Sequence, residues 1–274
     1  MLPFIRLGPF LLPTTALALL AGFWLGSALA EREANRLQLT AAHVVNGTLV
    51  AVVAGLVGAR LVYVARYLDV YLASPLSILS RNLGALAPTE GIVIGVLAAG
   101  LYWRRKKLPL RATLDVLTPL LAALAVGLGL AHLANGSAYG APTKLPWAIY
   151  LWDDYRHPAQ VYEILAAALI LGLIWRGRKA RLFPGFLFLS WLTLSAGARL
   201  LLETFRGDSV LVLGGLRTAQ LGALAVLLFS LWLMGRWART DAGQSQMAPS
   251  QTQSGGNPEA SRPHNRLLGG SGDQ

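Results

Sequence analysis

The sequence has 274 residues, of which 54% are hydrophobic and 14% are charged, and its formal net charge is +11. The apolar residues fall in long runs, which is typical of integral membrane proteins and excludes a secreted or disordered class. The chain has no cysteine, which excludes disulfides and thiolate chemistry of its own. Its basic residues lie mainly in short loops between apolar runs, a pattern that indicates membrane orientation and anionic lipid, with no nucleic acid as a partner.

Seven apolar runs are long enough to cross a hydrocarbon layer about 30 Å thick. They cover roughly residues 9–29, 42–64, 84–103, 114–134, 158–175, 183–203 and 210–234, with a charged loop at 31–36. The first run also imitates a signal peptide, but it is longer than a usual signal-peptide core. Residues 68–83 are amphipathic and contain Pro75, which favours an interfacial segment.

We therefore expect an all-α integral membrane protein with seven transmembrane helices in residues 1–240. Residues 241–274 are rich in Ser, Gly, Gln and Pro and are expected to form a disordered polar tail. The most basic loops, at 104–111 and 176–181, share one side of the membrane with the C-terminus. By the positive-inside rule this side is cytoplasmic, so the N-terminus lies outside.

A polar segment at residues 156–163 opens the otherwise apolar fifth run. Pro158 suits the first turn of a helix, so the segment predicts a helix N-terminus at the membrane surface. With about 3.6 residues per turn, His157, Gln160 and Glu163 form one slanted polar stripe. Polar groups in a membrane are costly without partners or water, which makes this stripe a candidate functional site. A solvated helix cap is the alternative.

Arg199, Glu203 and Arg206 follow one another at helical spacing near the outer end of the sixth run. One interpretation is that Glu203 neutralises Arg199 as a structural ion pair. The other is that Arg199 and Arg206 clamp a phosphate, because a planar guanidinium matches phosphate oxygens and stays charged in low dielectric. Arg60 is a third cation on the outer side, unless it only extends to the interface. The inferred site is a pocket for an anionic lipid headgroup.

Taken together, these motifs resemble the bacterial prolipoprotein diacylglyceryl transferases over residues 5–235. The most specific match joins residues 157–163, His-Pro-Ala-Gln-Val-Tyr-Glu, with Arg199 and the Glu-Thr-Phe-Arg of residues 203–206. The other matching positions are Gly8-Pro9, residues 58–63, Gly91 to Gly95, Asn135-Gly136, Gly140 and Gln220.

The resemblance implies an enzyme of the bacterial plasma (inner) membrane that moves the diacylglyceryl group of phosphatidylglycerol to a thiol and releases glycerol 1-phosphate. The thiol belongs to the lipobox cysteine of a preprolipoprotein signal peptide. The implied partners are these two substrates and membrane lipid, and no cofactor is implied. Arginines would hold the phosphodiester, and a base would take the thiol proton, since the thiolate is the nucleophile.

Site roles follow from the residues and from the resemblance. The candidate catalytic residues are His157, His132, Glu90, Arg199 and Glu203. The candidate substrate-binding residues are Arg60, Asn135, Gly140, Gln160, Tyr162, Glu163 and Arg206. No metal is expected, because the four histidines, His43, His132, His157 and His264, lack metal-ligand spacing.

Several positions depart from the family pattern. The family's arginine, asparagine and glutamate after the fourth span fall on Gly129, His132 and Ser137, and its histidine in the third span falls on Glu90. One hypothesis is a divergent transferase in which His132, Glu90 or His157 supplies the base. Another is a lipid-binding protein that has lost or changed the reaction. A seven-span receptor or transporter is a third, although no paired inverted halves are visible.

Overall fold

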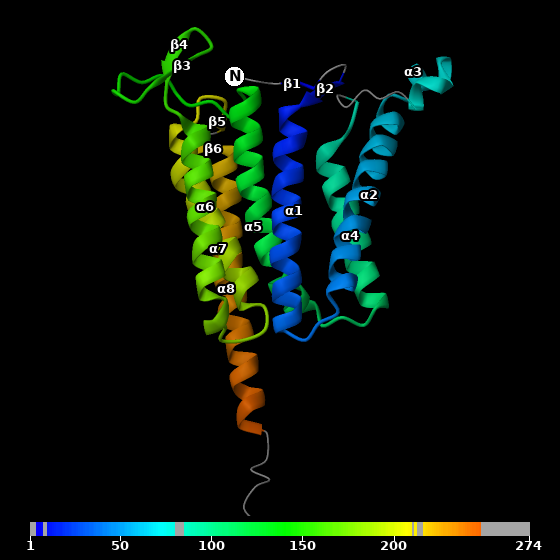
Figure 1. Ribbon diagram of the computed structural model, residues 1–274, viewed down its shortest axis with the longest axis vertical. Coiled ribbons are helices and arrows are strands. Elements are labelled where there is room, and N and C mark those ends of the chain that lie inside the picture. Colours follow the sequence, from blue (N-terminus) through cyan, green and yellow to red (C-terminus); the bar gives the residue numbers. More distant parts are fainter. Residues whose placement is uncertain (1–3, 8–9, 80–84, 210, 213–215, 248–274) are drawn as a thin grey trace, which may run out of the picture.

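The computed structural model describes residues 4–7, 10–79, 85–209, 211–212 and 216–247. Within these residues the regular elements are helices and three short antiparallel hairpins, which lie at the upper end in Figure 1. The expected all-α architecture is therefore confirmed. The Gly8-Pro9 motif and residues 248–274 of the expected tail lie outside the described residues.

Six of the described helices are long and apolar enough to cross a membrane, so the chain is a multi-pass membrane protein. They are α1 (Thr14–Arg36), α2 (Ala41–Arg66), α5 (Leu110–Asn135), α6 (Ala159–Gly177), α7 (Phe186–Leu202) and α8 (Thr218–Met247). The third expected span corresponds to α4 (Pro88–Arg105), which has 18 residues and includes Glu90, Arg104 and Arg105. Its charged ends shorten the apolar stretch, and α4 is not among the six.

Two helices differ in extent from the expected spans. A hairpin of β1 (Phe4–Leu7) and β2 (Phe10–Pro13) precedes α1, which then continues through residues 31–36, the expected charged loop. The helix persists there because the buried Glu33 pairs with Arg36 one turn later. A hairpin of β5 (Leu211–Val212) and β6 (Leu216–Arg217) delays α8 to Thr218, and α8 then passes the expected domain boundary at residue 240.

Close helix pairs organise the bundle. α2 lies along α4 and α1 lies along α5, whereas α6 and α7 pack beside α5, with α8 against α7 (Figure 1). Glycines permit two of these close approaches. A methyl group at Gly95 would lie 2.5 Å from the carbonyl oxygen of Ala51, and one at Gly127 would lie 2.7 Å from that of Ala18. Small residues therefore bring the backbones of neighbouring helices together, as is common in membrane bundles.

The lower end of the bundle in Figure 1 is joined by apolar and charged contacts. A buried apolar cluster that includes Ala34 and Trp103 links α1, α2, α4 and α5. Asp115 of α5, which is fully buried, accepts hydrogen bonds from the backbone N–H groups of Gly185 and Phe188 at 2.7 and 3.1 Å. Asp115 thus caps the N-terminus of α7 from a neighbouring helix.

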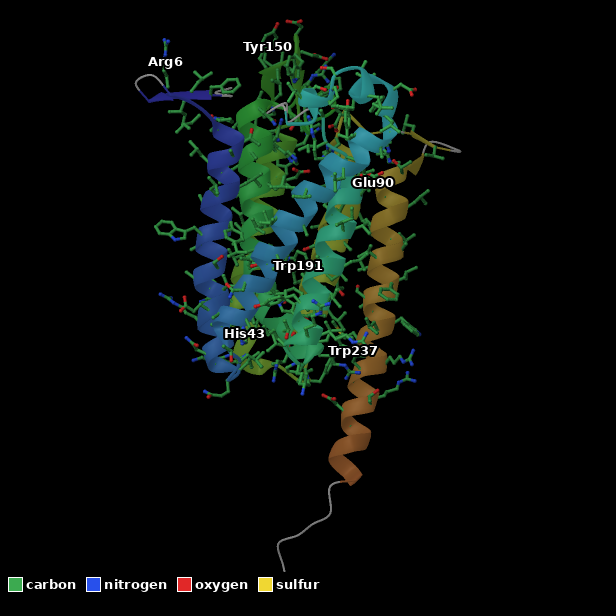
Figure 2. The ribbon with its side chains drawn as sticks, turned by 90° about the vertical axis from the view of Figure 1, so that its right-hand side faces the viewer. Arg6, His43, Glu90, Tyr150, Trp191 and Trp237 are labelled. Atoms are coloured by element: carbon green, nitrogen blue, oxygen red, sulfur yellow. The ribbon has the colours of Figure 1, made fainter. Side chains whose placement is uncertain are left out.

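The upper end carries the irregular elements. The described part of the expected interfacial segment forms α3 (Leu68–Ala73) and η1 (Pro75–Leu79), and α7 ends in η3 (Glu203–Phe205). The α5–α6 connection contains a hairpin of β3 (Ile149–Leu151) and β4 (Asp154–Arg156). Tyr150, labelled at the top of Figure 2, and Trp152 are exposed on it. Exposed aromatic residues here are typical of a membrane interface.

Candidate active site

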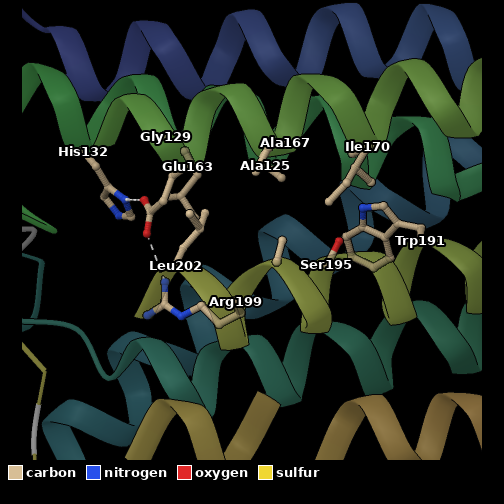
Figure 3. Close-up of a pocket in the computed structure, with 14 residues that line it drawn as sticks. Ala125, Gly129, His132, Glu163, Ala167, Ile170, Trp191, Ser195, Arg199 and Leu202 are labelled. Atoms are coloured by element: carbon tan, nitrogen blue, oxygen red, sulfur yellow. Dashed lines mark hydrogen bonds and ion pairs between the residues drawn. The ribbon is translucent and has the colours of Figure 1, made fainter. Parts of the chain in front are cut away.

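A cavity of about 160 Å³ lies between α5, α6 and α7 (Figure 3). Its middle is apolar. His132, Glu163 and Arg199 lie at one end, and Trp191 and Ser195 lie toward the other (Figure 3). The lining residues are Ala122, Ala125, Leu128, Gly129, His132, Glu163, Ala166, Ala167, Ile170, Trp191, Ser195, Ala198, Arg199 and Leu202.

Glu163 of α6 is the centre of the polar end. Its Oε2 lies 3.0 Å from Nδ1 of His132 on α5. Its Oε1 accepts hydrogen bonds from Arg199 of α7 at 3.1 Å and from Arg206, just after η3, at 2.8 Å. One carboxylate therefore gathers an imidazole and two guanidinium groups from three parts of the chain.

A second carboxylate, that of the buried Glu203, supports the two arginines. Its Oε2 lies 3.0 Å from Nε of Arg199, so the ion pair expected from their spacing is present. Arg206 donates two further hydrogen bonds to Asp208, at 2.9 and 2.7 Å. Burial acts to lower the pKa of Arg206, but Asp208, Glu163 and Glu203 outweigh it and raise the pKa above the ordinary value. Arg206 therefore keeps its charge.

The α5–α6 connection packs against the chain that follows η3. Ala141 N donates to Phe205 O at 2.7 Å, and Gly207 N donates to Tyr139 O at 2.9 Å. Gly140 lies at the crossing of the two segments, where a methyl group would overlap the carbonyl oxygen of His157. The absence of a side chain at residue 140 thus lets the α5–α6 connection fold back on itself, with Gly140 against His157, beside the polar cluster.

Asn135 and Gln160 hold the start of the same connection. The Asn135 side-chain oxygen accepts a hydrogen bond from Ser137 N at 2.9 Å. Gln160, which is fully buried, donates to the carbonyl oxygen of Ser137 at 3.0 Å. Both predicted binding residues therefore shape the loop that follows α5, and neither lines the cavity.

His157 and Tyr162 lie beside the cavity and do not line it. α6 begins at Ala159, so His157 precedes the helix on which the polar stripe was expected. Its ring packs 5.2 Å from that of Phe205 between centroids, and its buried Nδ1 has no hydrogen-bond partner among the described residues. The Tyr162 hydroxyl accepts a hydrogen bond from Nε1 of Trp147 at 2.8 Å.

Two further predicted site residues belong to the α2–α4 pair. Arg60 donates to the carbonyl oxygens of Ser77 and Ala85 at 2.9 and 2.8 Å. Glu90, labelled near the upper end of α4 in Figure 2, pairs with Arg66 of α2. Neither residue lines the cavity, because α2 packs against α4 and not against α6 or α7.

Sequence reasoning misses Arg217, which supports the site from β6. Its guanidinium donates to the carbonyl oxygen of Arg206 at 2.6 Å and to that of Glu203. Arg217 falls inside the apolar run at 210–234, and a charged residue within an expected span is itself a functional signal. Sequence reasoning also misses Trp191, which lines the cavity. Its buried Nε1 has no hydrogen-bond partner in the described part of the chain.

The arrangement can bind an anion and hold a proton acceptor. Guanidinium groups bind phosphate and carboxylate oxygens, and a carboxylate-bound imidazole is a frequent general base. In the described residues, no group of three His, Asp or Glu side chains is placed to hold a metal ion.

Comparisons with known proteins agree on one family. The family model for prolipoprotein diacylglyceryl transferase matches residues 3–236. A relative in Clostridioides difficile is 31% identical over 204 residues, which cover 74% of this chain and 82% of the relative. A relative in Synechococcus elongatus is 29% identical over 252 residues, or 84% of this chain and 86% of the relative.

A third relative, in Bacillus cytotoxicus, is 30% identical over 243 residues, which cover 83% of this chain and 88% of the relative. All three relatives carry the name phosphatidylglycerol–prolipoprotein diacylglyceryl transferase. The resemblance drawn from the motifs is thereby confirmed. The chain belongs to the prolipoprotein diacylglyceryl transferase family.

Proposed function

We propose that this protein transfers the diacylglyceryl group of phosphatidylglycerol to the lipobox cysteine thiol of a preprolipoprotein and releases glycerol 1-phosphate. The observation that carries the proposal is the convergence of Arg199 and Arg206 on Glu163 at the polar end of an apolar cavity. Such a site offers cations to a phosphate and apolar space to acyl chains. Membership of the family and the names of the relatives support the same reaction.

The apolar space extends beyond the first cavity. A second cavity, of about 520 Å³, lies between α6, α7 and α8. The two cavities adjoin, since both are lined by Ala166, Ile170, Ala198 and Leu202. A lipid whose headgroup lies at the polar end therefore has apolar space for its acyl chains on either side of the small alanine side chains.

The two arginines differ in how a substrate reaches them. The side chain of Arg199 is 40% exposed, whereas that of Arg206 is 11% exposed and is also bound by Asp208. Arg199 is therefore the arginine that contacts the phosphodiester, and Arg206 holds Glu163 in place. As the glycerol phosphate leaves, a fixed guanidinium stabilises the charge that develops on it.

The topology that we propose has seven spans, with α4 as the third, in the bacterial plasma membrane. α4 exposes Ile92, Val93, Val96 and Leu97 along its middle, which suits contact with lipid. The basic loops at 104–111 and 176–181 follow the lower ends of α4 and α6. The positive-inside rule makes that end cytoplasmic, so the N-terminus and the polar cluster lie on the outer side.

A second candidate function is lipid binding without transfer. The observation that favours it is Gly129, which stands where the family pattern implies an arginine. A methyl group at Gly129 would lie 2.8 Å from a side-chain carbon of Ile164 on α6, so an arginine there requires Ile164 to shift. Compared with the family pattern, the site then has one cation fewer to bind the leaving phosphate.

A complementation experiment separates the two functions. The chain is expressed in a cell depleted of its own transferase, and lipidation of a reporter with a lipobox cysteine is measured. We expect transfer by the natural chain, and a much larger loss for Arg199→Ala than for the control Arg6→Ala, which removes a guanidinium on the β1–β2 hairpin. Good expression without transfer would reject the proposed function. Equal losses in the two variants would reject the role of Arg199.

A further inference from the structure

His132 is the one of the three candidate bases that lines the cavity between α5, α6 and α7. Glu90 is paired with Arg66 on the α2–α4 pair. His157 packs its ring against Phe205, and its Nδ1 is buried. The side chain of His132 is 25% exposed, so a substrate in the cavity reaches it.

The hydrogen bonds of His132 define how its ring can act. Nδ1 lies 3.0 Å from Oε2 of Glu163, which orients the imidazole. Within the described residues Nε2 has no hydrogen-bond partner. When Nδ1 donates its proton to the carboxylate, Nε2 carries the lone pair and is the basic nitrogen.

Glu163 is held as a charged acceptor by the groups around it. Its other oxygen, Oε1, accepts from both Arg199 and Arg206, at 3.1 and 2.8 Å. Two cations on one carboxylate favour its ionised form, which is the form that orients a histidine base. Glu163 is therefore a positioning residue, and it also ties the base to the phosphate-binding arginine.

We infer that His132 is the general base that takes the proton of the substrate thiol, an inference that rests on the proposed transferase function. His132 Nε2 accepts the proton of the S–H group. The sulfur electron pair forms a bond to the glyceryl carbon that carries the phosphate, and the C–O bond of that carbon breaks. Its electron pair stays on the phosphate oxygen of the departing glycerol 1-phosphate beside Arg199.

The packing of α5 against α6 is consistent with this position. At Gly129, one turn before His132, the two helices touch so closely that a methyl group would lie 2.8 Å from Ile164. Below His132, a side chain at residue 129 would therefore push against Ile164 of α6. The histidine is the polar group that α5 presents to the cavity.

The test compares two nucleophiles on the full-length protein in vesicles that contain phosphatidylglycerol, under reducing conditions. One lipobox peptide carries cysteine, and a matched peptide carries selenocysteine, whose selenol is ionised at neutral pH and needs no base. The variants are His132→Gln and His132→Asn. The control is His43→Gln, which changes a histidine at the opposite end of the bundle (Figure 2).

We expect both His132 variants to lose about 100-fold or more in transfer to the cysteine peptide, the usual size of a general-base contribution. With the selenocysteine peptide the loss should shrink to a few-fold, because the proton transfer is no longer required. His43→Gln should match the natural chain with both peptides. Binding of phosphatidylglycerol to the variants is measured in parallel and should be unchanged.

Three outcomes would overturn the inference. Full activity of a His132 variant on the cysteine peptide shows that another group is the base. An equal loss with both peptides shows that His132 acts only through structure. If the natural chain transfers lipid to neither peptide, the proposed function itself fails, and the inference fails with it.

Discussion

Two carboxylates at opposite ends of the bundle are held by different kinds of donor. At the lower end, two of the donors to Asp115 are backbone N–H groups, and the third is Arg181 at 3.2 Å. At the upper end, every hydrogen-bond or ion-pair partner of the Glu163 carboxylate within the described residues is a side chain. A backbone donor cannot leave without opening the turn, whereas a side chain can rotate toward a substrate. The lower carboxylate therefore stabilises the fold, and the upper one holds groups that a ligand can engage.

Removal of the lower carboxylate should have the largest effect on stability. Asp115→Ala leaves Arg181 and the first N–H groups of α7 without a partner, and breaking a buried pair of this kind costs about 3–5 kcal/mol. We expect the thermal denaturation midpoint of the purified protein in detergent to fall by roughly 10 °C. Thr240→Ala, on the exposed part of α8, is the control. An unchanged midpoint for Asp115→Ala would show that α7 does not depend on this cap.

The matching change at the upper end should act on transfer more than on stability. Glu163→Gln keeps the size of the side chain but removes the charge that orients His132 and binds Arg199 and Arg206. We expect a loss of roughly 100-fold in lipid transfer, since both the base and the arginines lose their orientation.

The denaturation midpoint should meanwhile fall by less than that of Asp115→Ala, because the side chain of Glu163 is 15% exposed and that of Asp115 is fully buried. Transfer rate and midpoint are measured on the same preparations. If Glu163→Gln unfolds as easily as Asp115→Ala while the transfer rate per folded molecule is unchanged, the contrast between the two ends is wrong.

A smaller effect is expected where the α5–α6 connection crosses the segment after η3. Gly140→Ala places a methyl group against the carbonyl oxygen of His157 and disturbs the part of the connection that pairs with the second segment. Overpacking of this kind costs about 1–3 kcal/mol. Transfer should fall by several-fold, since Arg206 lies in the second segment and pairs with Gly140 across the crossing. Gly172→Ala, on an open face of α6, is the matched control and should behave as the natural chain.

The difference between the two ends also explains what the sequence can predict. Apolar runs predict the helices, because a segment buried in lipid must satisfy its own backbone hydrogen bonds, and a helix does so within the segment. Arg199 and Glu203 pair as expected, because residues four apart share a helix face. Arg60 and Glu90 do not reach the cavity, since a position near the outer surface does not reveal which helices are neighbours. The role of Arg217 depends on a hairpin that breaks an apolar run, and hydropathy does not show it.

The smallest effect is expected at the hydrogen bond between Trp147 and Tyr162, which ties the exposed connection to α6 at 2.8 Å. Trp147→Phe and Tyr162→Phe each remove one partner, at a cost of about 0.5–1.5 kcal/mol. Because the bond holds only the connection, local opening should become roughly two- to tenfold more frequent, with no change in the denaturation midpoint. Limited proteolysis of residues 141–157 measures that opening. The double variant should be cleaved no faster than either single variant, because the second substitution removes a bond that is already lost; additive rates would show that the two side chains act independently.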